Sequence, residues 1–335
     1  MRRGFSDEKG QGSTEICVKV RRSFDECRLL RTFAGAKAVV GKKTMKERSK
    51  IWGHVVAIGV VLIWGVTFIN TKVLLGCGLS PIEIFVIRFV LAYACIWCIS
   101  ERRLWCSSWR DELLMLALGV TGGSLYFAAE NEALRWTMAS NVSFIVCSAP
   151  LWTILLALML FRDVRATLRL FLGSLLALVG MAAIIFNGHF VLHLSPRGDL
   201  LALAAALCWA GYSILIRSVS GRYSAVFITR KVFAYGLLTI APVFVWLPWQ
   251  FPLSGLLQTP VWTNLLFLGL IASFACFVLW SWAVKEIGAL SSSNYIYLNP
   301  VATCIASALI LSEPITPIAI LGLILILVGV YLAEA

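Results

Sequence analysis

Long apolar runs, separated by short polar breaks, fill the chain after Met45. A helix that crosses a hydrocarbon core of ~30 Å needs roughly 20 apolar residues, and a window of that length finds ten such runs. Strands of a membrane barrel would instead alternate apolar and polar residues over short segments. The pattern therefore predicts an all-α membrane protein with ten transmembrane helices. The predicted spans are residues 52–75, 82–100, 112–134, 138–161, 168–188, 198–219, 226–248, 261–284, 289–311 and 317–333.

The chain also contains an internal repeat. Residues 125–163 align with residues 275–313 without a gap; six positions are identical, and two pairs of charged residues keep their sign. Because each half holds five spans, an odd number, the second half enters the membrane upside down relative to the first. Inverted repeats of this kind recur in secondary transporters, with the substrate site between them. We expect two inverted five-helix repeats, residues 51–188 and 189–335.

Composition agrees with a membrane protein. The chain is 60% apolar and 14% charged, whereas soluble domains are about 45–50% apolar and about 25% charged. A nucleic-acid-binding protein would gather its basic residues on a folded face, but here they lie in the N-terminal segment and in the breaks between apolar runs. Soluble catalysis and nucleic-acid binding are excluded on these grounds.

The N-terminal segment is strongly basic. Residues 1–50 hold 14 of the 29 Lys and Arg residues and six of the 17 acidic residues. Two interpretations remain open: a disordered cytoplasmic extension, or an over-long start with translation beginning at Met45. Neither gives the segment a chemistry of its own.

Basic residues near the span ends predict the orientation, because they stay on the cytoplasmic side. With the N-terminus inside, eleven basic residues after residue 50 fall in inner breaks and four fall on the outer side or in outer half-spans. We therefore expect both termini in the cytoplasm and, given the short loops, a bacterial cytoplasmic membrane. The four outer residues are Lys72, Arg88, Arg135 and Arg197.

Motifs in the first half resemble a known family. Residues 63–68 (Ile-Trp-Gly-Val-Thr-Phe), with residues 80–81 (Ser-Pro) and 88–89 (Arg-Phe), resemble the opening of an EamA-like repeat in the drug/metabolite transporter superfamily. Residues 133–140, followed by Pro150, resemble the second half of that repeat.

The second half fits the same pattern. Residues 283–285 (Ala-Val-Lys), then Pro300 and residues 312–314 (Ser-Glu-Pro), extend the resemblance over residues 50–333. The sequence departs from it at residues 161–163, Phe-Arg-Asp, where the family usually shows Gly-Glu. The resemblance implies ten spans and the export or exchange of small organic molecules.

Pro150 and Pro300 occupy equivalent positions, each near the middle of a predicted span. Proline removes one helical hydrogen bond and frees the carbonyl four residues back. In lipid, such a carbonyl needs a partner in protein or in a water-filled cavity. We expect a matched pair of kinks that line the pathway and flex during the cycle. The alternative is a pair of static kinks tolerated by packing.

Glu130 and Asn131 lie in the last turns of the third span. A carboxylate inside the membrane is costly and is a functional candidate by default. Glu130 could bind a cationic or amino group, or take up a proton. The alternative places it at the headgroup level, paired with Arg135 or Lys72.

Lys72 and Arg88 are expected near the outer ends of the first two spans. There they could hold an anionic group of a substrate. The alternative is structural: both side chains extend to the headgroups, with Glu83 as a nearby partner.

Aromatic and polar residues cluster in the first span of each half and just before Pro300. Because polar atoms inside a bundle need partners, such clusters tend to face a cavity. Hydrogen bonding between helices and an interfacial aromatic belt are the alternatives, so we expect about half of the cluster to line a substrate cavity. The candidates, with Trp280 as the counterpart of Glu130, are Trp64, Thr67, Asn70, Trp209, Tyr212, Ser213, Trp280, Asn294, Tyr295, Tyr297 and Asn299.

These features predict a secondary transporter that exports or exchanges small polar or amphipathic metabolites, amino acids among them, by alternating access. The sequence has no Walker motif, so a substrate or proton gradient would supply the energy. A nucleotide-sugar or sugar-phosphate exchanger is the first alternative, although it would favour several buried basic residues. A channel, or a membrane-embedded enzyme with a convergent catalytic set, is the second.

We expect no catalytic residues, no cofactor and no metal site, because the pair Cys95 and Cys98 lacks partnering ligands. The expected partners are a small-molecule substrate and the lipid bilayer. No nucleic acid is expected, and a homodimer is compatible with the sequence.

Overall fold

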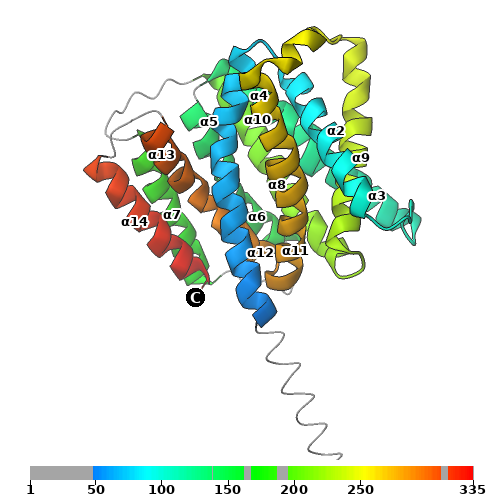
Figure 1. Ribbon diagram of the computed structural model, residues 1–335. Helices are drawn as coiled ribbons and strands as arrows, with labels where there is room; N and C mark the ends of the chain where they lie inside the picture. The colour runs from blue at the N-terminus through cyan, green and yellow to red at the C-terminus, as the bar shows by residue number, and fades with distance from the viewer. Residues whose placement is uncertain (1–47, 138, 162–166, 187–194, 311–315, 335) are drawn as a thin grey trace, which may run out of the picture. The chain divides into compact units, whose positions relative to one another are not determined.

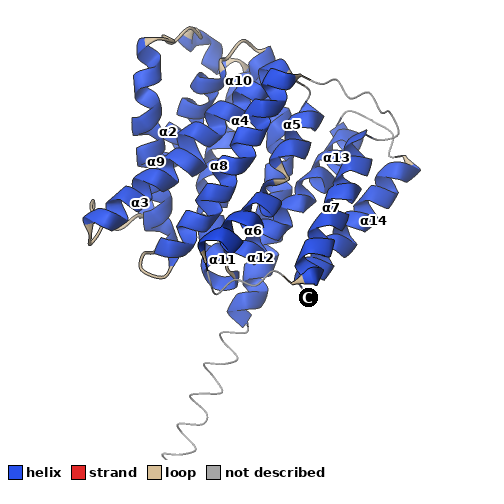
Figure 2. Cartoon of the chain, turned by 180° about the vertical axis from the view of Figure 1, so that it is seen from behind, coloured by secondary structure: helices blue, strands red, loops and turns tan. Residues whose placement is uncertain are grey.

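The computed structural model describes residues 48–137, 139–161, 167–186, 195–310 and 316–334. Contacts divide the chain after Ile51, and Trp52–Ala335 forms one compact unit, which is the unit described below. Throughout the described residues the secondary structure is helical, without strands, as seen from the two sides in Figure 1 and Figure 2. The prediction of an all-α protein is confirmed.

The two halves contain similar series of helices. The first half consists of the first helix (Arg48–Gly76), α2 (Pro81–Ile99), α3 (Trp109–Gly119), the π-helix η1 (Val120–Ser124), α4 (Leu125–Trp136), α5 (Ala139–Val146), α6 (Ala149–Leu160) and α7 (Leu168–Phe186). The second half consists of α8 (Pro196–Ser220), α9 (Ala225–Ile240), the 3₁₀ turns η2 (Ala241–Val245) and η3 (Leu253–Leu257), α10 (Thr259–Leu266), the π-helix η4 (Phe267–Ala275), α11 (Cys276–Ile287), α12 (Ala289–Asn294), the 3₁₀ turn η5 (Tyr295–Leu298), α13 (Asn299–Ile310) and α14 (Pro317–Glu334).

Seven helices in the described part of the chain are long and apolar enough to cross a membrane. Two shorter apolar helices, Leu168–Ala183 and Ile320–Ala333, add to them. The predicted span 289–311 is not one continuous helix, because α12, η5 and α13 divide it. The expected total of ten membrane crossings stays a prediction.

Local sequence explains where the second helix of each half begins. At α2, the Ser80 side chain accepts a hydrogen bond from the Glu83 amide while the Glu83 carboxylate accepts one from the Ser80 amide, which forms a capping box. At α9, the Ser224 hydroxyl accepts a hydrogen bond from the Phe227 amide. Both caps satisfy backbone amides that the first helical turn leaves without partners.

The third helix of each half contains a π-helical segment. The alignment of residues 125–163 with 275–313 places η1 opposite residues 270–274, inside η4. Such segments are rare and often occur at functional sites. Each one packs against the second helix of the other half, η1 against α9 and η4 against α2. The two halves therefore meet through two equivalent interfaces.

Both predicted proline kinks coincide with interrupted helices. Pro150 lies at the start of α6, after a break at Cys147 and Ser148, and Pro300 lies at the start of α13, after the η5 turn. Proline is tolerated in the first helical turn because no amide donor is required there. That the two breaks flex during transport stays a prediction.

Helices α7 and α14 pack closely along one edge of the unit (Figure 1). A Cβ atom added at Gly180 would lie 2.6 Å from the Gly322 carbonyl oxygen, and one at Gly173 would lie 2.6 Å from the Gly329 carbonyl oxygen. Small residues allow helix backbones to approach in this way inside membranes. These glycines are explained by packing.

Candidate functional site

A cavity lies between the two halves. The first helix, α2, α4 and α5 line it from the first half, and α8, α11, η5 and α13 line it from the second. The lining residues are Trp64, Thr67, Phe68, Arg88, Tyr126, Phe127, Glu130, Val146, Trp209, Phe277, Ile296 and Asn299.

Two opposite charges, Arg88 and Glu130, are buried in this cavity, with 3% and 6% of each residue exposed. Arg88 follows the first residue of α2, Pro81, by seven positions, which is about 10 Å of helix. It therefore lies well inside the helix. Charges at such depth are costly unless they are compensated, and they commonly mark a substrate or ion pathway.

The other half of the molecule holds Arg88 in place. Its Nε donates a hydrogen bond of 2.9 Å to the Ser273 hydroxyl, which lies in η4. Its guanidinium carbon lies 4.3 Å from the centre of the Phe127 ring, in cation–π geometry. The orientation of the guanidinium thus depends on both halves.

Glu130 lies on α4, one turn after Tyr126, whose hydroxyl interacts with the carboxylate. Arg88 is close enough to interact with Glu130 electrostatically. Both residues belong to the described part of the chain, and no direct salt bridge joins them. The cavity therefore contains a positive and a negative pole that are near each other but not in contact.

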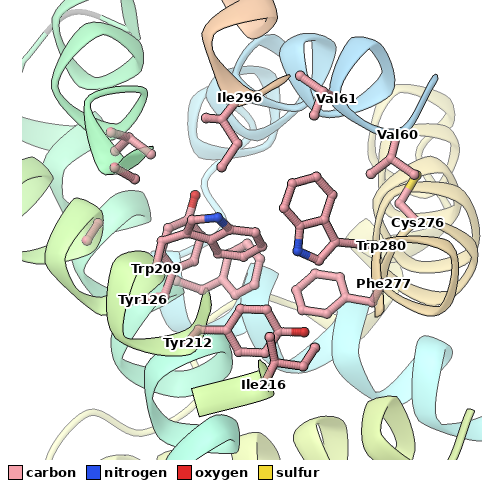
Figure 3. Packing of buried hydrophobic residues seen from close by; sticks show 14 of the residues in the cluster. Val60, Val61, Tyr126, Trp209, Tyr212, Ile216, Cys276, Phe277, Trp280 and Ile296 are labelled. Atoms are coloured by element: carbon pink, nitrogen blue, oxygen red, sulfur yellow. The ribbon is translucent and has the colours of Figure 1, made fainter. Parts of the chain in front are cut away.

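Aromatic residues make up half of the lining and continue into the packing behind it. Figure 3 shows Trp209 and Tyr126 on one side of the cluster and Phe277 and Trp280 on the other. The ring centre of Trp64 lies 5.1 Å from those of both Trp209 and Trp280. Such edge-to-face and tilted contacts stabilise aromatic clusters beyond simple burial. The wall is rigid and apolar, with a few polar atoms set into it.

Two polar atoms in the wall lack partners. Within the described residues, neither the indole nitrogen of Trp209 nor the amide oxygen of Asn299 makes a hydrogen bond, although each residue is only 5% exposed. Buried polar groups are nearly always satisfied in proteins. A bound molecule or water would satisfy both.

The structure brings together five of the thirteen residues expected in a substrate cavity: Trp64, Thr67, Glu130, Trp209 and Asn299. Trp280, Tyr212 and Tyr297 are fully buried in the packing around it. The remaining five, which also lie outside the lining, are Asn70, Asn131, Ser213, Asn294 and Tyr295.

Several of these outlying residues have structural partners. Asn131 donates to the Pro81 carbonyl oxygen at 3.1 Å, which ties α4 to the start of α2. The Asn70 amide lies 2.5 Å from the side-chain oxygen of Asn264. Tyr295 is hydrogen-bonded to a ring nitrogen of His54 at 2.7 Å. For these residues the alternative of hydrogen bonding between helices applies.

Arg88, expected near the outer end of the second span, is buried in the cavity, and Glu83 is not its partner. Glu83 does not pair with Arg88 or Lys72; its carboxylate accepts hydrogen bonds from the amides of Ser80, Gln250 and Phe251. A carboxylate at a helix N-terminus is held more strongly by amide donors than by a distant cation.

Lys72 is exposed and donates to the Leu134 carbonyl oxygen at 2.6 Å, near the end of α4. A cation there satisfies a carbonyl that the last helical turn leaves free. Lys72 therefore has a structural contact outside the cavity.

The aromatic and apolar wall was missed from the sequence. Phenylalanine, valine and isoleucine inside apolar runs carry no signal that separates a cavity wall from a lipid-facing surface. The missed lining residues are Phe68, Tyr126, Phe127, Val146, Phe277 and Ile296.

A buried ion pair lies at the other end of the unit from Pro81. Glu112, near the start of α3, pairs with Lys231 on α9 and accepts a hydrogen bond from Tyr235. The Cys106 amide donates to the same carboxylate at 2.7 Å. Both charged side chains are only 8% exposed. This network joins the two halves at the end where the α2–α3 and α8–α9 loops meet.

Contacts between those loops extend the network. The Tyr223 hydroxyl accepts a hydrogen bond from the Ser107 amide and donates one to Asp111, while Arg222 pairs with Asp111 at 2.5 Å. Burial, helped by the nearby Glu112 carboxylate, raises the pKa of the Cys106 thiol in the α2–α3 loop to about 11. That thiol is therefore neutral and a poor nucleophile.

Comparison with known proteins places both halves in one family. Residues 51–186 and 196–334 each match the model of the EamA-like transporter family. A protein of known crystal structure superposes with a TM-score of 0.68 over 84% of this chain and 97% of its own chain. At 17% sequence identity, this likeness shows the fold.

Proteins named as transporters are similar to this chain over most of their length. An uncharacterized transporter of Archaeoglobus fulgidus is 27% identical over 84% of this chain and 97% of its own. A probable amino-acid metabolite efflux pump of Escherichia coli is 26% identical over 83% and 93%. A probable terminal-alkyne amino-acid exporter of Streptantibioticus cattleyicolor is 28% identical over 66% and 73%. Because the matches span both halves and most of the chain, the protein belongs to the EamA-like transporter family and is an integral membrane transporter.

Proposed function

We propose that the protein is a secondary transporter that exports or exchanges small amphipathic metabolites by alternating access. The observation that carries the proposal is the cavity between the halves, which combines buried charges of both signs with an aromatic wall. A molecule bound there touches both repeats at once, so relative motion of the repeats can change which side of the membrane it faces. Two similar proteins bear the names probable amino-acid metabolite efflux pump and probable terminal-alkyne amino-acid exporter, which supports a substrate of this kind.

The proposed motion uses the two equivalent interfaces between the halves. The repeat alignment places Trp262 at the position of Glu112. Lys231 follows the capping serine of α9 by seven residues, and Ile87 follows the capping serine of α2 by the same number. The ion pair thus has no charged counterpart at the equivalent positions of the other interface. We infer that the ion pair helps close the end where it lies, which the distribution of basic residues predicts to be cytoplasmic.

The membrane and its sidedness belong to the same proposal. We place the protein in a bacterial cytoplasmic membrane with both termini inside, because basic residues of the short loops gather at one end. A broad hollow, lined by the α2 start, Glu132, Arg135 and residues 247–250, lies at the opposite end. It would serve as the outer vestibule.

A nucleotide-sugar or sugar-phosphate exchanger fits this cavity less well. Phosphate groups are held by several basic side chains or by amides at a helix N-terminus. The described lining has a single basic residue, Arg88, and an acidic residue, Glu130, beside it. Repulsion between Glu130 and a phosphate would oppose binding.

Counterflow in proteoliposomes tests the proposed function. Vesicles are preloaded with pools of amino acids, amines, organic acids or sugar phosphates, and uptake of the matching labelled compound is followed. A carrier gives saturable uptake that depends on the compound inside, because each half-cycle returns with a substrate bound. We expect this result for at least one pool, and saturable exchange abolished by removing the internal substrate.

A Glu130→Gln variant in the same assay separates the two roles expected for this carboxylate. If Glu130 carries the coupling proton, the variant keeps exchange but loses its dependence on pH. Uptake that does not saturate and needs no internal compound would show a channel instead, and uptake from none of the pools would contradict the proposal.

A further inference from the structure

We propose that the cavity selects small zwitterions with an apolar remainder, because Arg88 is placed to hold a carboxylate and Glu130 to hold an ammonium group. The inference rests on the proposed transport function and adds to it the class of substrate and the residue that reads each charge. Apolar amino acids have this chemistry.

The separation of the two charges is the first observation. Buried opposite charges are normally compensated by direct contact, since an unpaired buried charge is costly. Arg88 and Glu130 lie in one cavity, both nearly fully buried, yet in the described chain they form no direct salt bridge. The carboxylate and ammonium of a single small molecule would bridge them, each through a charge-assisted hydrogen bond.

The guanidinium of Arg88 is already oriented for an anion. Its Nε is engaged by Ser273 and one face lies over Phe127. Among the described residues its two terminal nitrogens have no hydrogen-bond partner. Those nitrogens are free to donate to a carboxylate, and the fixed Nε contact reduces the entropy lost on binding.

The unpartnered wall atoms serve the same ligand. The Trp209 indole N–H is a donor that a carboxylate can accept, and the Asn299 side-chain oxygen is an acceptor for an ammonium group. Both line the cavity. A simple anion would pair with Arg88 and the Trp209 N–H but leave Glu130 and the Asn299 oxygen unpaired. A simple cation would do the reverse.

The remaining wall accommodates an apolar group. Phe68, Phe127, Val146, Phe277 and Ile296 contribute purely apolar side chains to the lining. A site built around buried polar groups rejects ligands that leave those groups unpaired. The cavity therefore favours a zwitterion with an aliphatic or aromatic side chain over its deaminated and decarboxylated analogues.

Binding to the detergent-purified full chain tests this inference with matched probes. L-leucine is compared with isoamylamine, which lacks the carboxylate, and with isocaproate, which lacks the amine; L-phenylalanine, phenethylamine and hydrocinnamate form a second set. Isothermal titration gives each Kd. We expect both half-ligands to bind at least tenfold more weakly than the amino acid, the effect of one lost charge-assisted hydrogen bond.

Two variants assign each charge to its residue. In Arg88→Gln the advantage of the amino acid over the amine should disappear, while its advantage over the acid remains. In Glu130→Gln the reverse should hold. A loss of packing alone would weaken all three ligands equally, so the crossed pattern separates recognition from a structural role. Glu132→Gln, on the same helix but paired with Arg135 outside the cavity, is the matched control and should bind like the parent.

The inference is overturned if a half-ligand binds the parent as tightly as its amino acid, or if both variants weaken all probes alike. Its failure is distinguishable from that of the proposed function. If only the amine pool or only the organic-acid pool gave saturable counterflow, the protein would be a transporter but its substrate would not be a zwitterion. Crossed binding without any counterflow would keep the recognition site and remove the transport proposal.

Discussion

Replacing Val146 with phenylalanine should abolish transport while leaving the protein folded. Val146 is 4% exposed and lines the cavity from α5. A phenyl ring there enters the space that the substrate needs. The added ring crowds the lining, and crowding of a packed core costs ~1–3 kcal/mol, which should leave the protein folded. Counterflow should fall to the level of protein-free liposomes.

The control makes the same chemical change on a surface that faces lipid. Val179 on α7 is 53% exposed, so Val179→Phe adds a ring without filling the cavity. It should transport like the parent. Unimpaired transport by a monodisperse Val146→Phe protein would mean that the substrate takes another route.

The ion pair of Glu112 and Lys231 should give the largest effect on stability. Removing one partner leaves the other charge buried and unpaired, which costs about 3–5 kcal/mol in proteins. Glu112→Gln should therefore lower the unfolding temperature in detergent by roughly 5–10 °C. The doubly apolar variant Glu112→Met/Lys231→Met should recover most of that loss, because neither charge is then stranded.

An exposed pair calibrates the measurement. Arg135 and Glu132 form a contact of 3.3 Å with 56% of the Arg135 side chain exposed. Surface pairs contribute about 0–1 kcal/mol, so Arg135→Gln should change the unfolding temperature little. If Glu112→Gln changes the unfolding temperature as little as Arg135→Gln does, the ion pair of Glu112 and Lys231 does not stabilise the protein as described. If the double variant is worse than the single one, the loss comes from packing rather than from charge.

The lengths of the apolar runs predicted where most of the helices lie, because the thickness of the bilayer sets the length of a membrane-spanning helix. The helix α2 begins at Pro81 and ends at Ile99, close to the predicted span 82–100. The polar serines before α2 and α9, and the proline after Ser80, mark helix starts by known capping chemistry. The breaks at Pro150 and Pro300 were predicted on the same basis.

Depth within a span was not predictable in the same way. Arg88 was expected near an outer span end, where its long side chain could either hold an anionic group of a substrate or extend to the headgroups. The direction of the Arg88 side chain depends on the residues that it contacts. One of them, Ser273, is 185 residues away in sequence, so the contact cannot be read from the local pattern. Glu130 was named as a candidate because a carboxylate inside the membrane is costly, and the structure places it in the lining of the cavity.

Other features were not predicted because they depend on contacts between residues distant in sequence. Lys231 counts among the basic residues of an inner break, yet it is buried against Glu112, 119 residues away. The π-helical segments have no sequence signature that distinguishes them from ordinary helix. Neither feature follows from a single sequence without contacts between the halves.

Accessibility of the cavity from each side of the membrane tests the central claim most directly. Thr67 lines the cavity and is 8% exposed, and Thr67→Cys is nearly isosteric. Its reaction with a membrane-impermeant methanethiosulfonate is measured in inside-out and right-side-out vesicles, after subtraction of labelling in the parent, which carries its own cysteines. Alternating access to a substrate site predicts labelling from both sides, slowed by the amino-acid pool that supports counterflow. Labelling from neither side, or at a rate unchanged by that pool, would contradict the account.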